Sequence, residues 1–315
     1  MAAHSVAFDL MALLDAPGVG PSRVRKLLKR FAHSGGEALA DRSFLRESLT
    51  DAQIAALPAC REKMERQWDE LSIKGIHALS ITDAAYPAGL RAILGDDAPV
   101  VLLCQGNLAL LQSVGIGFSG SREATDKGIA TARETARLLA EQGVNVVSGY
   151  AAGVDRNAHC AALRAGGTTT VVLAEGILRF RVNSEIREYW DSTRTLVVSE
   201  FGANLPWSVS HAMTRNRTIC GLARAMVLIE ARATGGSIQA GRDCLRLGLP
   251  LFAAVYEGMP ESAVGNEQLL ESGGRRLMKS RTTGLPNVAP ILLALESETP
   301  MADRVRARAQ ASAMD

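Results

Sequence analysis

Residues 114–126 read VGIGFSGSREATD, an apolar run that ends in a glycine-rich turn and leads into a helix-forming segment. Apolar residues recur at helical spacing over residues 126–142, and a second apolar run follows at residues 144–147. A strand, a helix and a second strand in this order form a βαβ unit, whose two strands lie parallel in one sheet. The stretch therefore predicts a parallel sheet, and it places the turn at residues 119–122 where α/β proteins bind their ligands.

The same alternation continues through most of the chain. Further apolar or β-branched runs occur at residues 170–174, 195–198, 225–229 and 250–255, and helical patterns at 154–165, 184–190 and 236–247. Strands that are apolar on both faces indicate a sheet covered by helices on each side. Right-handed crossovers then give an α/β fold over residues 76–290, an extended Rossmann-like, doubly wound and mostly parallel sheet.

The two ends of the chain lack this pattern. Residues 1–75 show apolar residues at helical spacing and no convincing strand, which predicts a small helical domain of the helix-hairpin-helix type. Residues 296–315 are rich in alanine, arginine and acidic residues and have almost no large apolar side chains. We therefore expect residues 291–315 to form a flexible tail.

The composition excludes several classes of protein. A formal net charge of +2 over 315 residues excludes a uniformly basic DNA-binding surface. Of the 35 basic residues 29 are arginine, a side chain that suits phosphate and that a GC-rich genome also favours. No apolar stretch approaches transmembrane length, and five scattered cysteines without a CxxC pair indicate neither disulfides nor zinc. We expect a cytoplasmic protein with no membrane span, metal ion or cofactor.

A Gly-x-Gly hairpin, Gly18 and Gly20, separates two helical patterns near the N-terminus. Residues 19–33 carry five basic residues and no acid, among them Arg23, Arg25 and Lys26. Amides of such a turn and the basic side chains after it can contact DNA phosphates without reading bases, which makes these five residues a candidate secondary DNA contact. A tight turn with a solvated basic face explains the pattern equally well.

Three glycine-rich turns that follow predicted strands can bind phosphate through backbone amides, hydroxyl groups and a guanidinium. Their candidate ligands are Gly120, Ser121 and Arg122 in the first turn, Gly149 and Gly153 in the second, and Gly235, Gly236 and Ser237 in the third. None of the turns has the GxGxxG fingerprint in register or the lysine of a Walker A motif, so an NAD or ATP site is not indicated.

Two arginines flank an asparagine at Arg215, Asn216 and Arg217. They lie in a segment, residues 203–246, that holds six arginines and two acidic residues, so we expect the three residues to contact phosphate. The alternative for Arg217 is a structural salt bridge. The motif directly precedes an apolar segment that begins at residue 218, and the pattern of this segment fits either a helix or a strand.

Asp155 and His159 lie four residues apart, on one face of the helix predicted over residues 154–165. Such a pair can act as an acid–base couple, but more often it caps a helix and fixes a turn. No nucleophile elbow accompanies the pair, so we expect a structural role and no catalytic residues.

Short motifs occur in a specific order and spacing along the chain: Tyr86-Pro87, Gly120-Ser121-Arg122, Ser148-Gly149, Gly153-Val154-Asp155, Arg215-Asn216-Arg217, Gly236-Ser237 and Gly265-Asn266. Together they resemble the DNA-processing protein A family (DprA, also called Smf). The resemblance implies a non-enzymatic protein that binds single-stranded DNA, protects incoming DNA and helps to load RecA in natural transformation and recombination, usually as a homodimer. It also implies that Arg122 and residues 215–217 hold the DNA backbone.

The chain departs from the family pattern at several positions. Ala152 stands where arginine is common, residues 211–213 lack the aromatic side chain that often precedes the Arg-Asn-Arg motif, and too few residues follow residue 290 for a winged helix. We therefore expect phosphate contacts to contribute more to binding than base stacking. The alternative is a nucleotide-binding Rossmann protein, a phosphoribohydrolase or a nucleotide sensor, although residues 235–242 lack the Thr and Glu of the phosphoribohydrolase signature.

Overall fold

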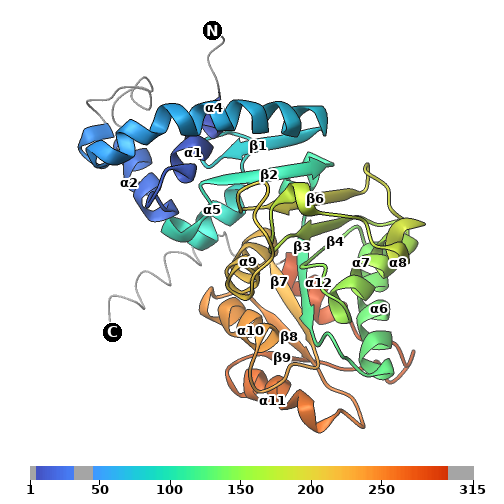
Figure 1. Cartoon of the computed structure of the whole chain (residues 1–315). Coiled ribbons are helices and arrows are strands. Elements are labelled where there is room, and N and C mark those ends of the chain that lie inside the picture. The colour runs from blue at the N-terminus through green and yellow to red at the C-terminus, as the bar shows by residue number, and fades with distance from the viewer. Residues whose placement is uncertain (1–4, 32–44, 297–315) are drawn as a thin grey trace.

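The computed structural model describes residues 5–31 and 45–296 (Figure 1). Its centre is a nine-stranded sheet with the strand order β1-β2-β6-β5-β4-β3-β7-β8-β9. The strands are β1 (Ile76–Ser80), β2 (Val101–Gly106), β3 (Gly115–Gly120), β4 (Asn145–Ser148), β5 (Thr169–Val172), β6 (Thr195–Ser199), β7 (Ala225–Ile229), β8 (Leu251–Ala254) and β9 (Arg275–Leu277). In this order, every pair of neighbouring strands from β6 through β5, β4, β3, β7 and β8 to β9 is parallel. The pairs β1-β2 and β2-β6 are antiparallel.

Helices connect the parallel strands and precede them. Those of the described residues are α1 (Val6–Asp15), α2 (Pro21–Phe31), α4 (Asp51–Ile73), α5 (Ala88–Leu94), α6 (Asp126–Glu141), α7 (Val154–Arg164), α8 (Ser184–Arg187), α9 (Val209–Leu222), α10 (Gly236–Arg246), α11 (Val264–Glu271) and α12 (Ala289–Glu296). The α/β class and the mostly parallel Rossmann-like sheet expected from the sequence are confirmed.

The sheet is buried on both faces because alternate residues of each strand meet different helices. In β3, Ile116 and Phe118 point into a cluster formed with α6, α7 and α12. On the opposite face, α5, α9 and α10 pack against a cluster that includes Leu102 of β2 and Leu228 of β7. This double burial explains why the strands read as continuous apolar runs in the sequence.

The strand order reverses between β3 and β7. From β3 the chain builds β4, β5 and β6 on one side and then crosses back to add β7, β8 and β9 on the other. Helices diverge on either side of such a switch point, so a crevice opens at the carboxyl ends of the two strands. The turns that follow Gly120 and Ile229 therefore lie at the ligand-binding position of this fold.

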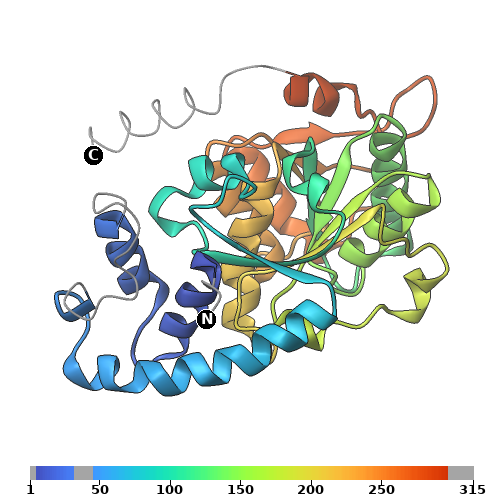
Figure 2. The same ribbon diagram turned by 90° about the horizontal axis from the view of Figure 1, so that it is seen from above.

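The N-terminal helices join the sheet at its antiparallel edge. Residues of α1 and α4 pack with Val101 and Leu103 of β2 in one apolar cluster. Thr50 and Gln53 form a capping box that fixes the start of α4. Figure 2 shows these blue helices at one end of the molecule and the red C-terminal helix α12 at the other, where it packs with Phe252 of β8.

Helix α12 corrects the first part of the predicted flexible tail. Residues 291–296, expected to be flexible, belong to α12, and Ile291 and Leu295 are buried in the cluster with Phe252 of β8. A short helix with one apolar face is stabilised by the sheet it covers, a contact that composition alone does not reveal. The rest of that prediction, residues 297–315, lies outside the described residues. No helix between residues 5 and 31 or between 45 and 296 is long and apolar enough to cross a membrane.

Candidate nucleic-acid interface

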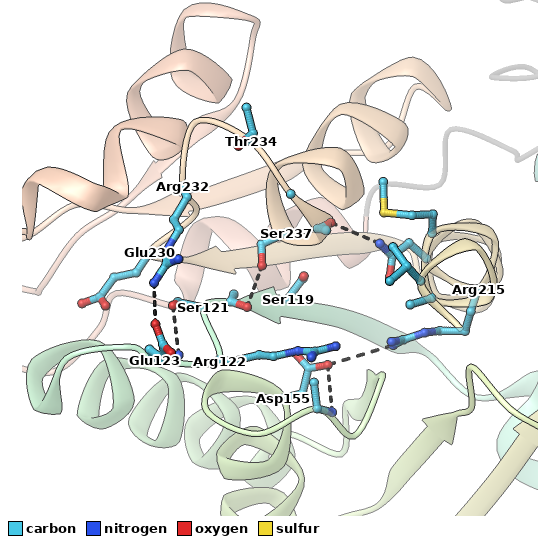
Figure 3. Close-up of a pocket in the computed structure, with 18 of the residues that line it drawn as sticks. Ser119, Ser121, Arg122, Glu123, Asp155, Arg215, Glu230, Arg232, Thr234 and Ser237 are labelled. Carbon is cyan, nitrogen blue, oxygen red and sulfur yellow. Dashed lines mark hydrogen bonds and ion pairs between the residues drawn. The ribbon is translucent and has the colours of Figure 1, made fainter. Parts of the chain in front are cut away.

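A cleft of about 390 Å³ opens at the carboxyl end of the sheet, at the switch point between β3 and β7 (Figure 3). Its lining comes from the end of β3 and the turn after it, the loop and helix start at α7, the loop before α9 and the first two turns of α9, and the segment from the end of β7 to the start of α10. The residues are Ser119, Gly120, Ser121, Arg122, Glu123, Ala151, Asp155, Trp207, Val209, Ala212, Met213, Arg215, Asn216, Glu230, Arg232, Thr234, Gly235, Gly236 and Ser237.

The glycine-rich turn after β3 is fixed by its neighbours. The amide of Ser121 donates a hydrogen bond to the carbonyl of Ile229 (3.1 Å), and the hydroxyl of Ser237 donates one to the carbonyl of Gly120 (2.6 Å). The Ser121 hydroxyl in turn accepts from the amide of Glu123 (3.1 Å). Ser121 and Ser237, both predicted phosphate ligands, thus line the cleft and also hold its two walls together.

The N-terminus of α10 faces the same cleft. Gly235 precedes the helix without any side-chain cap, and the space beside Gly235 and Gly236 is open. The amide of Asn216 donates to the Gly236 carbonyl (3.1 Å) and so anchors this end of α10 to α9. An eleven-residue helix presents free amides and the positive end of its dipole at this point, both of which favour an anion.

Arg215 is the most unusual side chain of the site. It is 5% exposed, and its Nη1 lies 4.0 Å from Oδ2 of Asp155. Within the described part of the chain its guanidinium makes no hydrogen bond, and its Nε is buried without a partner. Burial lowers the pKa of Arg215 and raises the pKa of Asp155, each opposed by the charge of the other. A buried guanidinium with unused donors is costly unless an anion binds to it.

The turn after β4 is shaped around Arg215. A methyl group at Gly149 would overlap the guanidinium of Arg215, so only glycine leaves room for it. The carboxylate of Asp155 accepts hydrogen bonds from the amides of Gly149 (3.2 Å) and Ala151 (3.4 Å), which fixes the turn. Gly153 has a φ of +77°, and a side chain there would overlap the carbonyl of Ser121. Gly149 and Gly153 were predicted as ligands, but they do not line the cleft. They allow the close contacts of this turn with Arg215 and with the turn after β3.

Arg122 is an exposed cation of the cleft. Figure 3 shows its side chain extending toward Asp155 and the guanidinium of Arg215. No carboxylate in residues 5–31 or 45–296 lies within ion-pair distance of it, and its guanidinium lies over the indole ring of Trp207, 5.5 Å from the ring centroid. Arg122 therefore keeps its fork available for a phosphate.

Trp207 and Arg232 line the cleft but were not predicted from the sequence as site residues, and Glu230 lines it as well. Trp207, in the loop before α9, is 45% exposed, and only its position among apolar residues ahead of a helix marks it in the sequence. Arg232 forms an ion pair with Glu123 (2.5 Å). Glu230 has a φ of +53°. Its carboxylate accepts hydrogen bonds from the Thr125 amide (2.7 Å), the Thr125 hydroxyl (2.5 Å) and the Tyr256 hydroxyl, and these bonds hold it in place.

Arg217 forms the structural salt bridge that was its alternative role, in place of the predicted contact in the cleft. It does not line the cleft; its Nη2 pairs with Oδ2 of Asp97 at 2.6 Å, in the segment between α5 and β2. Residues two apart on a helix project in nearly opposite directions, and α9 spans the whole Arg215-Asn216-Arg217 motif. Only Arg215 and Asn216 of the motif reach the cleft.

Asp155 and His159 do not form an acid–base couple. Asp155 lies in the first turn of α7 and binds the preceding loop, while the N-cap position belongs to Gly153. His159 is fully buried and its Nδ1 shares a hydrogen bond with the Thr169 hydroxyl (2.6 Å). Burial, reinforced by the charge of Arg215, lowers the pKa of His159 to about 3. In the described residues no group of three or more acidic, histidine or cysteine side chains could hold a metal ion.

The predicted secondary contact lies away from the cleft, whose lining runs only from Ser119 to Ser237. The hairpin at Gly18 and Gly20 connects α1 and α2, and Gln53 donates a hydrogen bond to the Pro17 carbonyl (3.0 Å) within it. Arg23 donates to Gln53 (2.9 Å) and Arg25 to the carbonyl of Ala98 (3.2 Å), whereas Lys26 is exposed. Both arginines thus take part in the packing of the hairpin.

Comparison with known proteins places this site in context. The DNA processing protein DprA of Streptococcus pneumoniae R6 is 31% identical over 243 residues, which cover 73% of this chain and 84% of the relative. Protein Smf of Escherichia coli K12 is 31% identical over 179 residues, 56% of this chain and 47% of the relative.

Solved structures agree with the sequence relatives. The X-ray structure of DprA from S. pneumoniae matches with a TM-score of 0.69 at 27% identity, over 87% of this chain and 95% of that structure. DNA processing protein A from Helicobacter pylori, described with a unique single-stranded DNA binding mode, matches with a TM-score of 0.54 at 26% identity, over 64% and 90%.

The family described as DNA recombination-mediator protein A matches residues 77–284, which include all nineteen residues that line the cleft. The matched region is more than half of the chain, and the relatives and the solved structures agree with it. The chain belongs to the DNA recombination-mediator protein A family, whose members include the DprA and Smf proteins.

Proposed function

We propose that this protein binds single-stranded DNA along the cleft, without catalysing a reaction on it. The observation that carries the proposal is Arg215, a buried guanidinium that makes no hydrogen bond within the described residues. Arg122 and the uncapped start of α10 at Gly235 face the same space, so three phosphate-binding groups converge. Phosphate matches all three, because it is anionic and offers several oxygens to a bidentate fork.

The cleft is built for a single strand rather than for a duplex. It is about 390 Å³ in volume, and its lining combines charged side chains with apolar ones from Trp207, Val209, Ala212 and Met213, which come from the loop before α9 and from α9. Single-strand binding combines a basic groove that follows the backbone with apolar surfaces that meet the bases. The bases of a duplex are paired and stacked on one another, so they cannot reach such a surface.

The wider role follows from the family. We propose that the bound strand is protected during DNA uptake and recombination and is then passed to RecA, with the protein acting as a homodimer. The S. pneumoniae relative, a DNA processing protein, and the H. pylori protein with its single-stranded DNA binding mode support the DNA-binding part of this proposal.

Fluorescence anisotropy with labelled oligo-dT, a duplex of the same length and dTMP as competitor, at low and high salt, tests the proposal. We expect oligo-dT to bind more tightly than the duplex, an affinity that falls as salt rises, and no effective competition by dTMP. Arg122→Ala should weaken oligo-dT binding because a phosphate contact is lost. Equal binding of duplex and single strand would contradict the proposal, and tight binding of dTMP alone would favour a nucleotide-binding protein.

A further inference from the structure

The cleft contains one large aromatic side chain whose position nothing in the packing of the fold requires. Trp207 lines the cleft and is 45% exposed, although indole rings are normally well covered. It directly precedes Ser208, whose hydroxyl accepts a hydrogen bond from the His211 amide and caps α9. The ring is therefore carried by a fixed helix start rather than by a free loop.

The start of α9 leaves this ring uncovered. An apolar residue before the N-cap commonly packs against the fourth residue of the helix, which here is Ala212. The methyl group of Ala212 is too small to cover an indole. The other aromatic ring at this end of α9, that of His211, is stacked on Phe201 with centroids 4.3 Å apart and an interplanar angle of 24°. Trp207 is thus the aromatic surface that the cleft offers.

The ring also lies next to the cation that the proposed function assigns to phosphate. The guanidinium of Arg122 lies over the Trp207 ring at 5.5 Å, and nearly half of the Trp207 surface stays exposed with Arg122 in place. In a nucleic acid strand each base is joined through its sugar to a phosphate, so a base platform and a phosphate ligand must be neighbours. Arg122 and Trp207 have this arrangement.

We propose that Trp207 is a base-stacking residue of the cleft and that Arg122 holds the adjoining phosphate of the same strand. The inference rests on the proposed single-strand binding and adds a contact to the bases, which the sequence led us to expect to be weak. Stacking on an aromatic ring accepts any base, so the contact strengthens binding without selecting a sequence.

The test compares oligo-dT with an abasic strand of the same length and backbone charge, for the wild-type protein and for Trp207→Ala, Trp207→Phe and Leu205→Ala. Leu205 is a matched control, since it is exposed in the same loop and does not line the cleft. The readout is the ratio of the two affinities. Any indirect effect of the substitution on Arg122 changes binding of both strands alike and cancels in that ratio.

We expect the wild-type protein to bind oligo-dT at least about fivefold more tightly than the abasic strand, the lower end of the range for one stacked base. Trp207→Ala should bring the ratio close to one, Trp207→Phe should keep most of it, and Leu205→Ala should leave it unchanged. A wild-type ratio that persists in Trp207→Ala overturns the inference while single-strand binding stands. Failure of the wild-type protein to bind either strand overturns the proposed function as well.

Discussion

The guanidinium of Arg215 lies against the Cα atom of Gly149, at the place that any side chain of residue 149 would occupy. The turn after β4 and helix α9 are far apart in sequence, and their contact creates the buried position of the proposed phosphate ligand. Gly149 therefore contributes to the site by leaving room for the guanidinium of Arg215, and it is not itself a ligand.

Gly149→Ala should displace this guanidinium and weaken oligo-dT binding. The backbone at Gly149 is outside the left-handed region, so alanine fits the chain itself, and only the flexible end of Arg215 must move. A lost charge-assisted contact of about 1.5–3 kcal/mol corresponds to a loss of affinity of roughly tenfold or more. Anisotropy titrations measure this effect, and Gly202→Ala, outside the cleft lining, is the control.

The double variant Gly149→Ala with Arg215→Lys provides the decisive comparison. Because both changes act on the same guanidinium, their effects on binding should not add. Additive losses, or full affinity in Gly149→Ala, would show that Arg215 does not bind the DNA.

Arg217→Ala should leave oligo-dT binding unchanged, in contrast to Arg122→Ala. The Arg217 side chain pairs with Asp97 outside the cleft, and an ion pair with partners 35% and 56% exposed contributes at most about 1 kcal/mol to stability. Arg122→Ala should reduce the slope of log affinity against log salt by about one, while Arg217→Ala keeps the wild-type slope. A reduced slope in Arg217→Ala would extend the DNA path toward α5.

The fold could be predicted from the sequence where burial is two-sided. The run at residues 225–229 is β7 itself, and the helix expected over residues 126–142 is α6 within one residue. Strands β1 and β2 were not predicted individually. For β1 the reason is its place at the edge of the sheet, where only Ile76 and Ser80 are buried and the sequence pattern is mixed. Helix α12 was missed because its stability depends on the sheet beneath it.

The site was only partly predictable because the secondary structure around the Arg-Asn-Arg motif was ambiguous. The apolar pattern around residue 218 fits either a helix or a strand, and the choice decides whether Arg215 and Arg217 share a face. In a strand, residues two apart point the same way, whereas in a helix they point apart. The structure has a helix there, so Arg217 leaves the cleft. Trp207 lies in a loop, where no periodic pattern exists to indicate a direction.

His159→Asn should make the free energy of unfolding less dependent on pH. Burial holds the pKa of His159 at about 3, below the ordinary value of 6.5, so between these values the unfolded chain binds a proton that the folded chain does not. The contribution of His159 is complete above pH 6.5 and is lost as the pH falls, by about 1.4 kcal/mol per pH unit. Asparagine does not titrate and can still bond to Thr169.

Chemical unfolding from pH 7 to pH 4 measures the difference between the two proteins. Asp155 contributes with the opposite sign, since burial raises its pKa, but it is present in both and cancels. The wild-type curve should therefore fall more steeply than that of His159→Asn. Parallel curves would mean that His159 titrates normally in the folded protein.

Ile291→Ala tests whether α12 belongs to the folded core. Ile291 is completely buried against the sheet, so its truncation should lower the free energy of unfolding by about 2–5 kcal/mol. Leu293 is on the same helix but is 67% exposed, and Leu293→Ala should change the value by no more than about 0.5 kcal/mol. Both variants place alanine in the same helix, so helix propensity affects them alike. Equal stability of the two in urea would mean that residues 291–296 are flexible, as the sequence predicted, because only packing on the sheet distinguishes the two positions.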